Sequence, residues 1–133
     1  MKEKENKQVI MRYWWEKAQN RLLSAEREIE YGSLSFAINR LYYSLFYAVS
    51  SELLEKGDFY KKHTGVRAAF HKNFIRTGKM DKEMGRLYDQ LFEDRQDGDY
   101  IAFVEFEKEY VEEKLANCKE FLDKLSKLSN LFD

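Results

Sequence analysis

The sequence has no proline, a single cysteine and no long apolar run. A helix needs about 20 consecutive, mostly apolar residues to cross a bilayer, so the sequence predicts no membrane-spanning segment. Residues 1–7 are charged and lack the apolar core of a signal peptide, so we expect a cytoplasmic protein that does not associate with membranes. Cys118 has no partner for an intrachain disulfide, which agrees with a reducing compartment.

The sequence also has a small net charge and only two histidines. The 23 basic and 24 acidic residues leave a formal charge of −1, so no overall field attracts polyanions. A nucleic-acid or nucleotide site must therefore be a local cluster of Arg and Lys. The two histidines, His63 and His71, have no carboxylate at a metal-ligand spacing. We predict no metal site and no cofactor.

The composition is typical of one globular domain. Of the 133 residues, 44% are hydrophobic and 35% are charged, which is too apolar for a disordered protein. The length is also common for single domains. We expect one domain over residues 1–133, with residues 1–7 as a frayed N-terminal tail.

Apolar residues repeat at helical spacing, and four of the six glycines stand where this pattern ends, at positions 32, 57, 78 and 98. Alternation of period two is never sustained, so no strand is expected. Ser33 or Ser35 is the expected cap of the second helix. The pattern predicts helices near residues 8–31, 36–56, 66–77, 82–93 and 103–128, with a basic loop at 58–65 and a charged turn at 94–100. Short connections between such helices favour an all-α fold, an antiparallel bundle of four or five helices.

The segment 36–54 is nearly all apolar or aromatic but carries a charge, Arg40. Helical spacing places Arg40, Ser44 and Tyr47 on one face and leaves a second face apolar. Arginine is almost never buried without a partner, so a carboxylate, a phosphate or a symmetry-related neighbour is expected to meet Arg40. The segment therefore predicts a polar stripe at a protein or ligand interface.

Three segments resemble the HEPN domain family. Residues 37–47 resemble its Arg-bearing aromatic helix, residues 62–66 the loop before its third helix, and residues 95–100 the turn before its last helix. The resemblance implies a bundle that commonly forms a two-fold homodimer in which the Arg-bearing helices face one cleft. It also implies a partner, because family members are often encoded beside minimal nucleotidyltransferases.

The resemblance further implies a chemistry that this sequence does not complete. Active members resemble metal-independent ribonucleases with an Arg followed, after four to six intervening residues, by a His. Arg40 matches, but Leu45, Phe46 and Tyr47 stand where the His would be. Lowering a tyrosine pKa of about 10 by some three units needs on the order of 4 kcal/mol, so Tyr47 is a poor substitute. In a subset of the family a tyrosine accepts nucleotidyl groups, and Tyr47 matches that position.

We therefore expect a noncatalytic nucleotide- or RNA-binding module, the partner of a nucleotidyltransferase in a toxin–antitoxin-type pair. The alternative is a metal-independent ribonuclease toxin with a degenerate motif, for which Arg40, Tyr47 and His63 are the catalytic candidates. A third interpretation gives Arg40 and Tyr47 only a structural role at a dimer interface. The predicted ligand-binding residues are Asn39, Arg40, Tyr43, Ser44, Tyr47, Lys62 and His63.

Within this expected site, Arg40 clamps a phosphate, Asn39 and Ser44 donate hydrogen bonds, and Tyr43 or Tyr47 stacks on a base. The acidic and basic residues of the 94–100 segment are expected to cap helices, not to catalyse a reaction or bind a metal. These residues are Arg95, Asp97 and Asp99.

Overall fold

The computed structural model describes residues 2–100 and 104–132. Within this part of the chain the secondary structure is entirely helical, as predicted. The α-helices are α1 (Lys2–Glu30), α2 (Leu34–Glu55), α3 (His63–Phe70), α4 (Lys82–Tyr100) and α5 (Lys108–Leu128). A π-helical turn, η1 (His71–Ile75), continues α3, and a 3-10 turn, η2 (Asn130–Phe132), follows α5.

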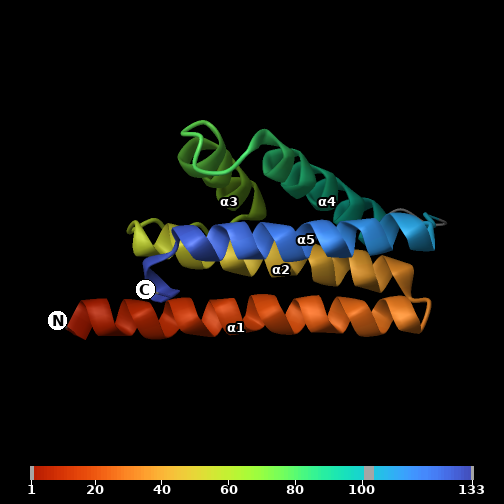
Figure 1. Cartoon of the computed structure of the whole chain (residues 1–133), viewed down its shortest axis with the longest axis horizontal. Coiled ribbons are helices and arrows are strands. Elements are labelled where there is room, and N and C mark those ends of the chain that lie inside the picture. The colour runs from red at the N-terminus through yellow and green to blue at the C-terminus, as the bar shows by residue number, and fades with distance from the viewer. Residues whose placement is uncertain (1, 101–103, 133) are drawn as a thin grey trace.

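Helix α2 is the centre of the bundle. It packs against each of the other four α-helices. In Figure 1, α1 and α2 lie side by side and run in opposite directions, α5 lies along α2, and α3 and α4 cover the remaining side. Its inward side chains are apolar and fully buried, among them Ile38, Leu41 and Leu45. The predicted apolar face of this segment is thus the face that the other helices cover.

Three predicted helix ends are confirmed. Gly32, Gly57 and Gly78 each follow a helix and adopt the left-handed backbone conformation, with φ angles of 78°, 86° and 76°. Glycine adopts this conformation without the strain that a Cβ atom causes, which explains why the pattern stops at these positions. Within the described residues, no helix has the length and apolar composition to cross a bilayer.

Helix α1 is longer than predicted, because residues 2–7 are helical and do not form a frayed tail. This stretch contains only Lys, Glu and Asn and no helix breaker, and Lys and Glu have high helix propensity. The predicted start of the last helix, Phe103, lies outside the described residues. Helix α5 begins at Lys108.

The predicted turn at 94–100 is wrong, because α4 continues through it to Tyr100. Asp94 and Arg95 are buried there, and Asp94 accepts hydrogen bonds from Gln90 and Tyr110. Gly98 lies inside this helix and does not end it. A glycine suits this position because a Cβ atom here would lie only 3.2 Å from Cε2 of Phe106. Tertiary contacts therefore outweigh the usual cost of a glycine within a helix, about 1 kcal/mol.

Helix α3 also begins earlier than predicted, at His63. The backbone N–H groups of Gly65 and Val66 both donate to the carbonyl of Lys62. Gly65 lies within this helix. A glycine suits the position because the Tyr60 ring packs against it, 3.1 Å from where a Cβ atom would be. The first turn of α3 thus replaces the end of the predicted loop.

Candidate functional site

The predicted face of α2 borders an open hollow between α1 and α2. Six residues line this cationic hollow: Arg21, Ser24, Asn39, Arg40, Tyr43 and Tyr47. Four of them come from the predicted ligand-binding set on α2, and two come from α1. The sequence pattern thus grouped the α2 members correctly in space, but the α1 members lie too far away in sequence to appear in it.

The hollow concentrates positive charge beside aromatic rings. Nζ of Lys17 lies 4.8 Å from the centroid of the Tyr47 ring, and Cζ of Arg21 lies 5.7 Å from it. Such cation–π contacts hold both cations over the ring. In residues 2–100 and 104–132, no carboxylate oxygen lies within 4.0 Å of the cationic nitrogens of Lys17, Arg21 or Arg40. The hollow is therefore a basic site that can accept an anion.

Arg40 is half-buried at the edge of this hollow, not buried as expected. Its Nη1 donates a hydrogen bond of 2.8 Å to Oδ1 of Asn39. Nδ2 of Asn39 in turn donates to Oδ2 of Asp99 on α4, at 3.4 Å. Asn39 therefore orients Arg40, and the partially exposed guanidinium retains donors for an incoming ligand.

Ser44 does not belong to the hollow, so its predicted role as a ligand-binding neighbour is wrong. The residue is completely buried, and its Oγ donates a hydrogen bond of 2.6 Å to the carbonyl of Leu41. Cys118 of α5 lies next to the Ser44 side chain, so α5 covers this side of α2. Lys62 is exposed immediately before α3 and does not line the hollow.

The buried arginine of this region is Arg95, on α4. It is 8% exposed, and its Cζ lies 4.9 Å from the Tyr42 ring centroid and 5.9 Å from that of Tyr43. Its Nη1 lies 3.8 Å from Oδ2 of Asp99, and its buried Nε has no hydrogen-bond partner among the residues that the structure describes. The guanidinium is thus held mainly by aromatic faces. The sequence did not indicate this, because the segment 94–100 was predicted to be an exposed turn.

His63 packs in the same cluster and not in the hollow. Its Nδ1 lies 2.7 Å from the Tyr42 hydroxyl, and its ring stacks on Phe46 with centroids 4.5 Å apart. Burial, followed by the positive charge of Arg95, lowers the pKa of His63. Burial also raises the pKa of Tyr42 to about 12. At neutral pH the pair is therefore a neutral imidazole beside a protonated phenol.

Tyr43 joins this His63 cluster, which we define as Tyr42, Tyr43, Phe46, His63 and Arg95, to the cationic hollow. Its ring lines the hollow and meets the His63 ring edge-on, with centroids 5.6 Å apart. Asp99 provides a second connection, because it is close to Asn39 on one side and to Arg95 on the other. The buried Arg95 thus lies directly behind the part of the surface that carries Arg40.

The arrangement offers phosphate-binding groups, stacking groups and one imidazole. In the described residues, no group of three or more His, Cys, Asp or Glu side chains is placed to hold a metal ion. Asp97 is exposed on α4. The chemistry available here is anion binding by guanidinium groups and proton exchange by an imidazole.

Comparison with known proteins places these observations in a family. The model of the HEPN domain matches residues 11–128. A "UPF0332 protein" of Thermotoga maritima is 44% identical over 122 residues, which cover 92% of each chain. A Methanocaldococcus jannaschii protein named "Putative toxin" is 38% identical over 112 residues, which cover 84% of this chain and 76% of the relative. A second protein of that name and organism is 30% identical over 91 residues, which cover 68% of this chain and 67% of the relative. The chain belongs to the HEPN domain family.

Proposed function

We propose that this chain binds single-stranded RNA or nucleotides through the cationic hollow, as the noncatalytic module of a toxin–antitoxin-type pair. One observation carries the proposal. Lys17, Arg21 and Arg40 gather around the rings of Tyr43 and Tyr47 without a carboxylate partner in the described part of the chain. Because the chain's net charge is −1, this local excess of cations is not a general property of the surface.

The two kinds of side chain suit the two parts of a nucleotide. A guanidinium donates paired hydrogen bonds to phosphate oxygens, and an aromatic ring stacks on a base of any sequence. Double-stranded RNA presents its bases already stacked, so the half-buried tyrosines of the hollow favour single strands. The proposal therefore predicts weak sequence preference and strong dependence on salt.

The sequence around both arginines supports a noncatalytic role. The positions at the family's His spacing are Leu45, Phe46 and Tyr47 after Arg40, and Tyr100, Ile101 and Ala102 after Arg95. None is a histidine. Proton transfer during RNA cleavage near pH 7 needs a group such as an imidazole.

A second candidate function is supported by the His63 cluster. A neutral imidazole lies beside the Tyr42 hydroxyl, with the Arg95 guanidinium over the same ring. An imidazole of this kind can act as a base toward a ribose 2′-hydroxyl, and a guanidinium can stabilise the charge that develops on the phosphate. The chain would then be a metal-independent ribonuclease that uses His63 in place of the family's histidine.

We also propose two protein partners. The names of the relatives support a toxin–antitoxin-type pair, in which a nucleotidyltransferase is the expected partner. A homodimer through the Arg40 face of α2 is supported by Phe36, which is 60% exposed one helical turn before Arg40. Light scattering tests the dimer: Phe36→Glu is expected to halve the mass of the particle, and a wild-type mass of one chain would exclude it.

Binding of a fluorescent single-stranded RNA decamer tests the hollow. Arg40→Ala is expected to weaken binding and to reduce the slope of log K against log salt by about 0.7, the value for one lost phosphate contact on a single strand. Arg76→Ala, which removes an exposed arginine outside the hollow, is the matched control. Equal affinity and equal salt slope for both variants would exclude the hollow as the RNA site.

Incubation of the same RNA in EDTA separates the two functions. A noncatalytic module leaves the RNA intact under conditions in which it binds. Cleavage that disappears in His63→Ala and Arg95→Ala, but persists in Arg76→Ala, would establish the ribonuclease. Because cleavage by a contaminating enzyme persists in every variant, the same experiment identifies that artefact.

A further inference from the structure

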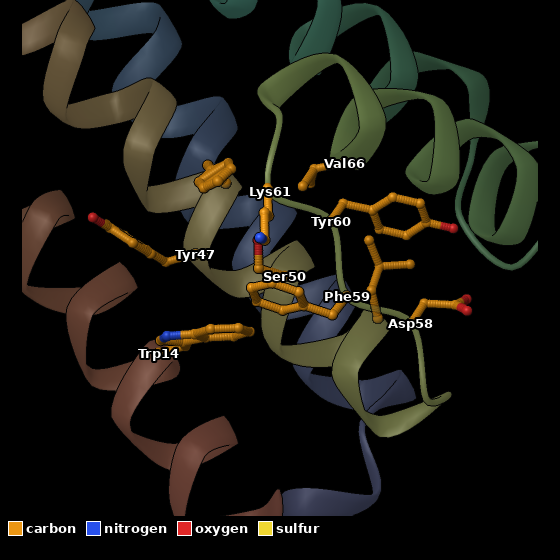
Figure 2. Close-up of a pocket in the computed structure, with 10 residues that line it drawn as sticks. Trp14, Tyr47, Ser50, Asp58, Phe59, Tyr60, Lys61 and Val66 are labelled. Atoms are coloured by element: carbon orange, nitrogen blue, oxygen red, sulfur yellow. The ribbon is translucent and has the colours of Figure 1, made fainter.

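A second cavity lies between α1, α2 and the segment that leads into α3. It measures about 300 Å³, and half of the ten residues that line it are aromatic: Trp14, Phe46, Tyr47, Phe59 and Tyr60. Figure 2 shows Trp14 from α1 and Phe59 from the connecting segment close together, and Ser50 and Lys61 also line the cavity. We call this cavity the aromatic pocket.

The aromatic pocket is shaped for a flat ring. The Trp14 and Phe59 rings are inclined by only 23°, with centroids 6.4 Å apart. Phe59 remains 62% exposed despite its apolar ring, so its outer face is not used by the fold. The segment that carries it is held in place, because the N–H of Asp58 donates to the carbonyl of Leu53 at 3.0 Å and Tyr60 packs on Gly65.

The pocket also has a few polar groups that a planar heterocycle can use. Ser50 offers a hydroxyl, Asp58 a carboxylate and Lys61 an ammonium group. A mostly apolar cavity with a small number of polar groups is the usual form of a small-molecule site, and about 300 Å³ is at the small end of the range. The size suits one base and excludes a large cofactor.

Tyr47 connects the aromatic pocket with the cationic hollow, because it lines both. On the hollow side, Lys17 and Arg21 lie over its ring. A phosphate bound to these cations is therefore separated from the aromatic pocket by a single side chain. The juxtaposition matches a nucleotide, whose charged phosphate and flat base are joined by one sugar.

We propose that the aromatic pocket holds one nucleobase of the RNA strand or nucleotide whose phosphate lies in the cationic hollow. The inference rests on the proposed function and extends it from phosphate binding and stacking on the tyrosines of the hollow to the capture of one base in a separate pocket. Trp14 and Phe59 form the stacking surfaces, and Ser50 and Lys61 provide hydrogen bonds to the edge of the base. The strand is thus anchored at one position by its base and elsewhere by its backbone.

Tryptophan emission provides a direct readout of this pocket. The chain has two tryptophans, and Trp15 is 3% exposed while Trp14 lines the cavity. Tetraadenylate RNA is titrated against an abasic tetramer with the same sugars and phosphates. The intact RNA is expected to quench the emission and to bind at least about fivefold more tightly than the abasic strand, because one stacked base contributes that much. Trp14→Phe should abolish the quenching.

Phe59→Ala tests the pocket without disturbing the core, since this ring is largely exposed. It is expected to remove most of the preference for intact over abasic RNA and to leave only the part that comes from stacking on the tyrosines of the hollow. Tyr31→Ala is the matched control, because Tyr31 is an exposed aromatic residue, 83% accessible, beyond the far end of α1. Titration with adenosine monophosphate and ribose 5-phosphate then distinguishes the source of the base: quenching by the monophosphate assigns the pocket to free nucleotides, and quenching by the tetramer alone assigns it to a strand.

The outcomes separate this inference from the proposed function. If abasic and intact RNA bind equally, or if Phe59→Ala retains the preference, while Arg40→Ala weakens both, the hollow binds RNA but the pocket does not bind a base. If Arg40→Ala has no effect while Phe59→Ala removes the preference, the pocket is correct and the hollow is not. If wild-type protein binds neither strand, nor adenosine monophosphate, nor ribose 5-phosphate, both proposals are wrong.

Discussion

Glu52 is a buried carboxyl group near the C-terminal end of α2, and it makes stability depend on pH. The residue lies on α2, is 3% exposed, and its Oε2 accepts a hydrogen bond of 2.9 Å from Nε1 of Trp15. Burial raises its pKa from 4.5 to about 7, and the hydrogen bond from Trp15 offsets only part of this effect. The folded protein therefore holds the proton of Glu52 at pH values where the unfolded chain has lost it.

The direction of the effect follows from proton binding. A group whose pKa is higher in the folded state contributes its full stability below the unfolded pKa, and that contribution is lost as pH rises toward the folded pKa. For Glu52 the window runs from 4.5 to about 7. Each pKa unit corresponds to about 1.4 kcal/mol, so the loss is about 3 kcal/mol across the window.

Glu52→Gln isolates this term, because glutamine retains an oxygen that accepts the Trp15 hydrogen bond and does not ionise. Urea unfolding is measured for both proteins at pH 4.5 and pH 8. The free energy of unfolding of the variant, relative to wild type, is expected to rise by about 3 kcal/mol between the two pH values, with a corresponding relative gain in melting temperature of roughly 10 °C.

Glu16→Gln, a change at an exposed glutamate on α1, is the matched control and should follow the wild-type profile at both pH values. A Glu52→Gln profile parallel to that of wild type would refute the reasoning. It would mean that Glu52 ionises in the folded protein as readily as in the unfolded chain.

Three further predictions concern packing and electrostatics. Gly85→Ala is expected to lower the free energy of unfolding by about 1–3 kcal/mol in urea, because its Cβ would lie 3.0 Å from Cε1 of His71; a stabilised variant would contradict this packing. Cys118 is completely buried and burial raises its pKa, so the native protein should resist alkylation by iodoacetamide and react only in denaturant; labelling without unfolding would contradict it. Arg95→Ala should raise the pKa of His63 in an NMR titration, because it removes a nearby positive charge, and an unchanged value would show that burial alone sets it.

The fold was largely predictable because helix formation in this chain depends on local signals. The positive-φ glycines at 32, 57 and 78 end helices for a reason that the residue itself supplies. Gly98 follows the opposite rule, because its place is set by the Phe106 ring from a segment beyond the helix. A glycine that makes room for a neighbour and a glycine that ends a helix are identical in sequence.

The candidate site was predictable only within α2. Spacing along one helix correctly brought Asn39, Arg40, Tyr43 and Tyr47 to a common side, since residues three and four apart are neighbours. It failed for Ser44, which is on the same side by spacing, because the boundary of the exposed stripe depends on where α5 packs. The edges of a functional face are a tertiary property.

Arg95 and Asp99 show that the electrostatics of the site also depend on tertiary structure. Arg95 influences His63 from 32 positions away in sequence, and it reaches the cluster only because α4 continues as a helix where a turn was predicted. Once that turn is a helix, Arg95 and Asp99 lie one turn apart and face α2, where Asp99 meets Asn39 and the Arg95 guanidinium lies over Tyr42. The orientation of Arg40 through Asn39 and the part of the His63 pKa shift that comes from Arg95 therefore share one origin, the helical conformation of the segment 94–100. A change that unwinds this segment should disturb the cationic hollow and the His63 cluster together.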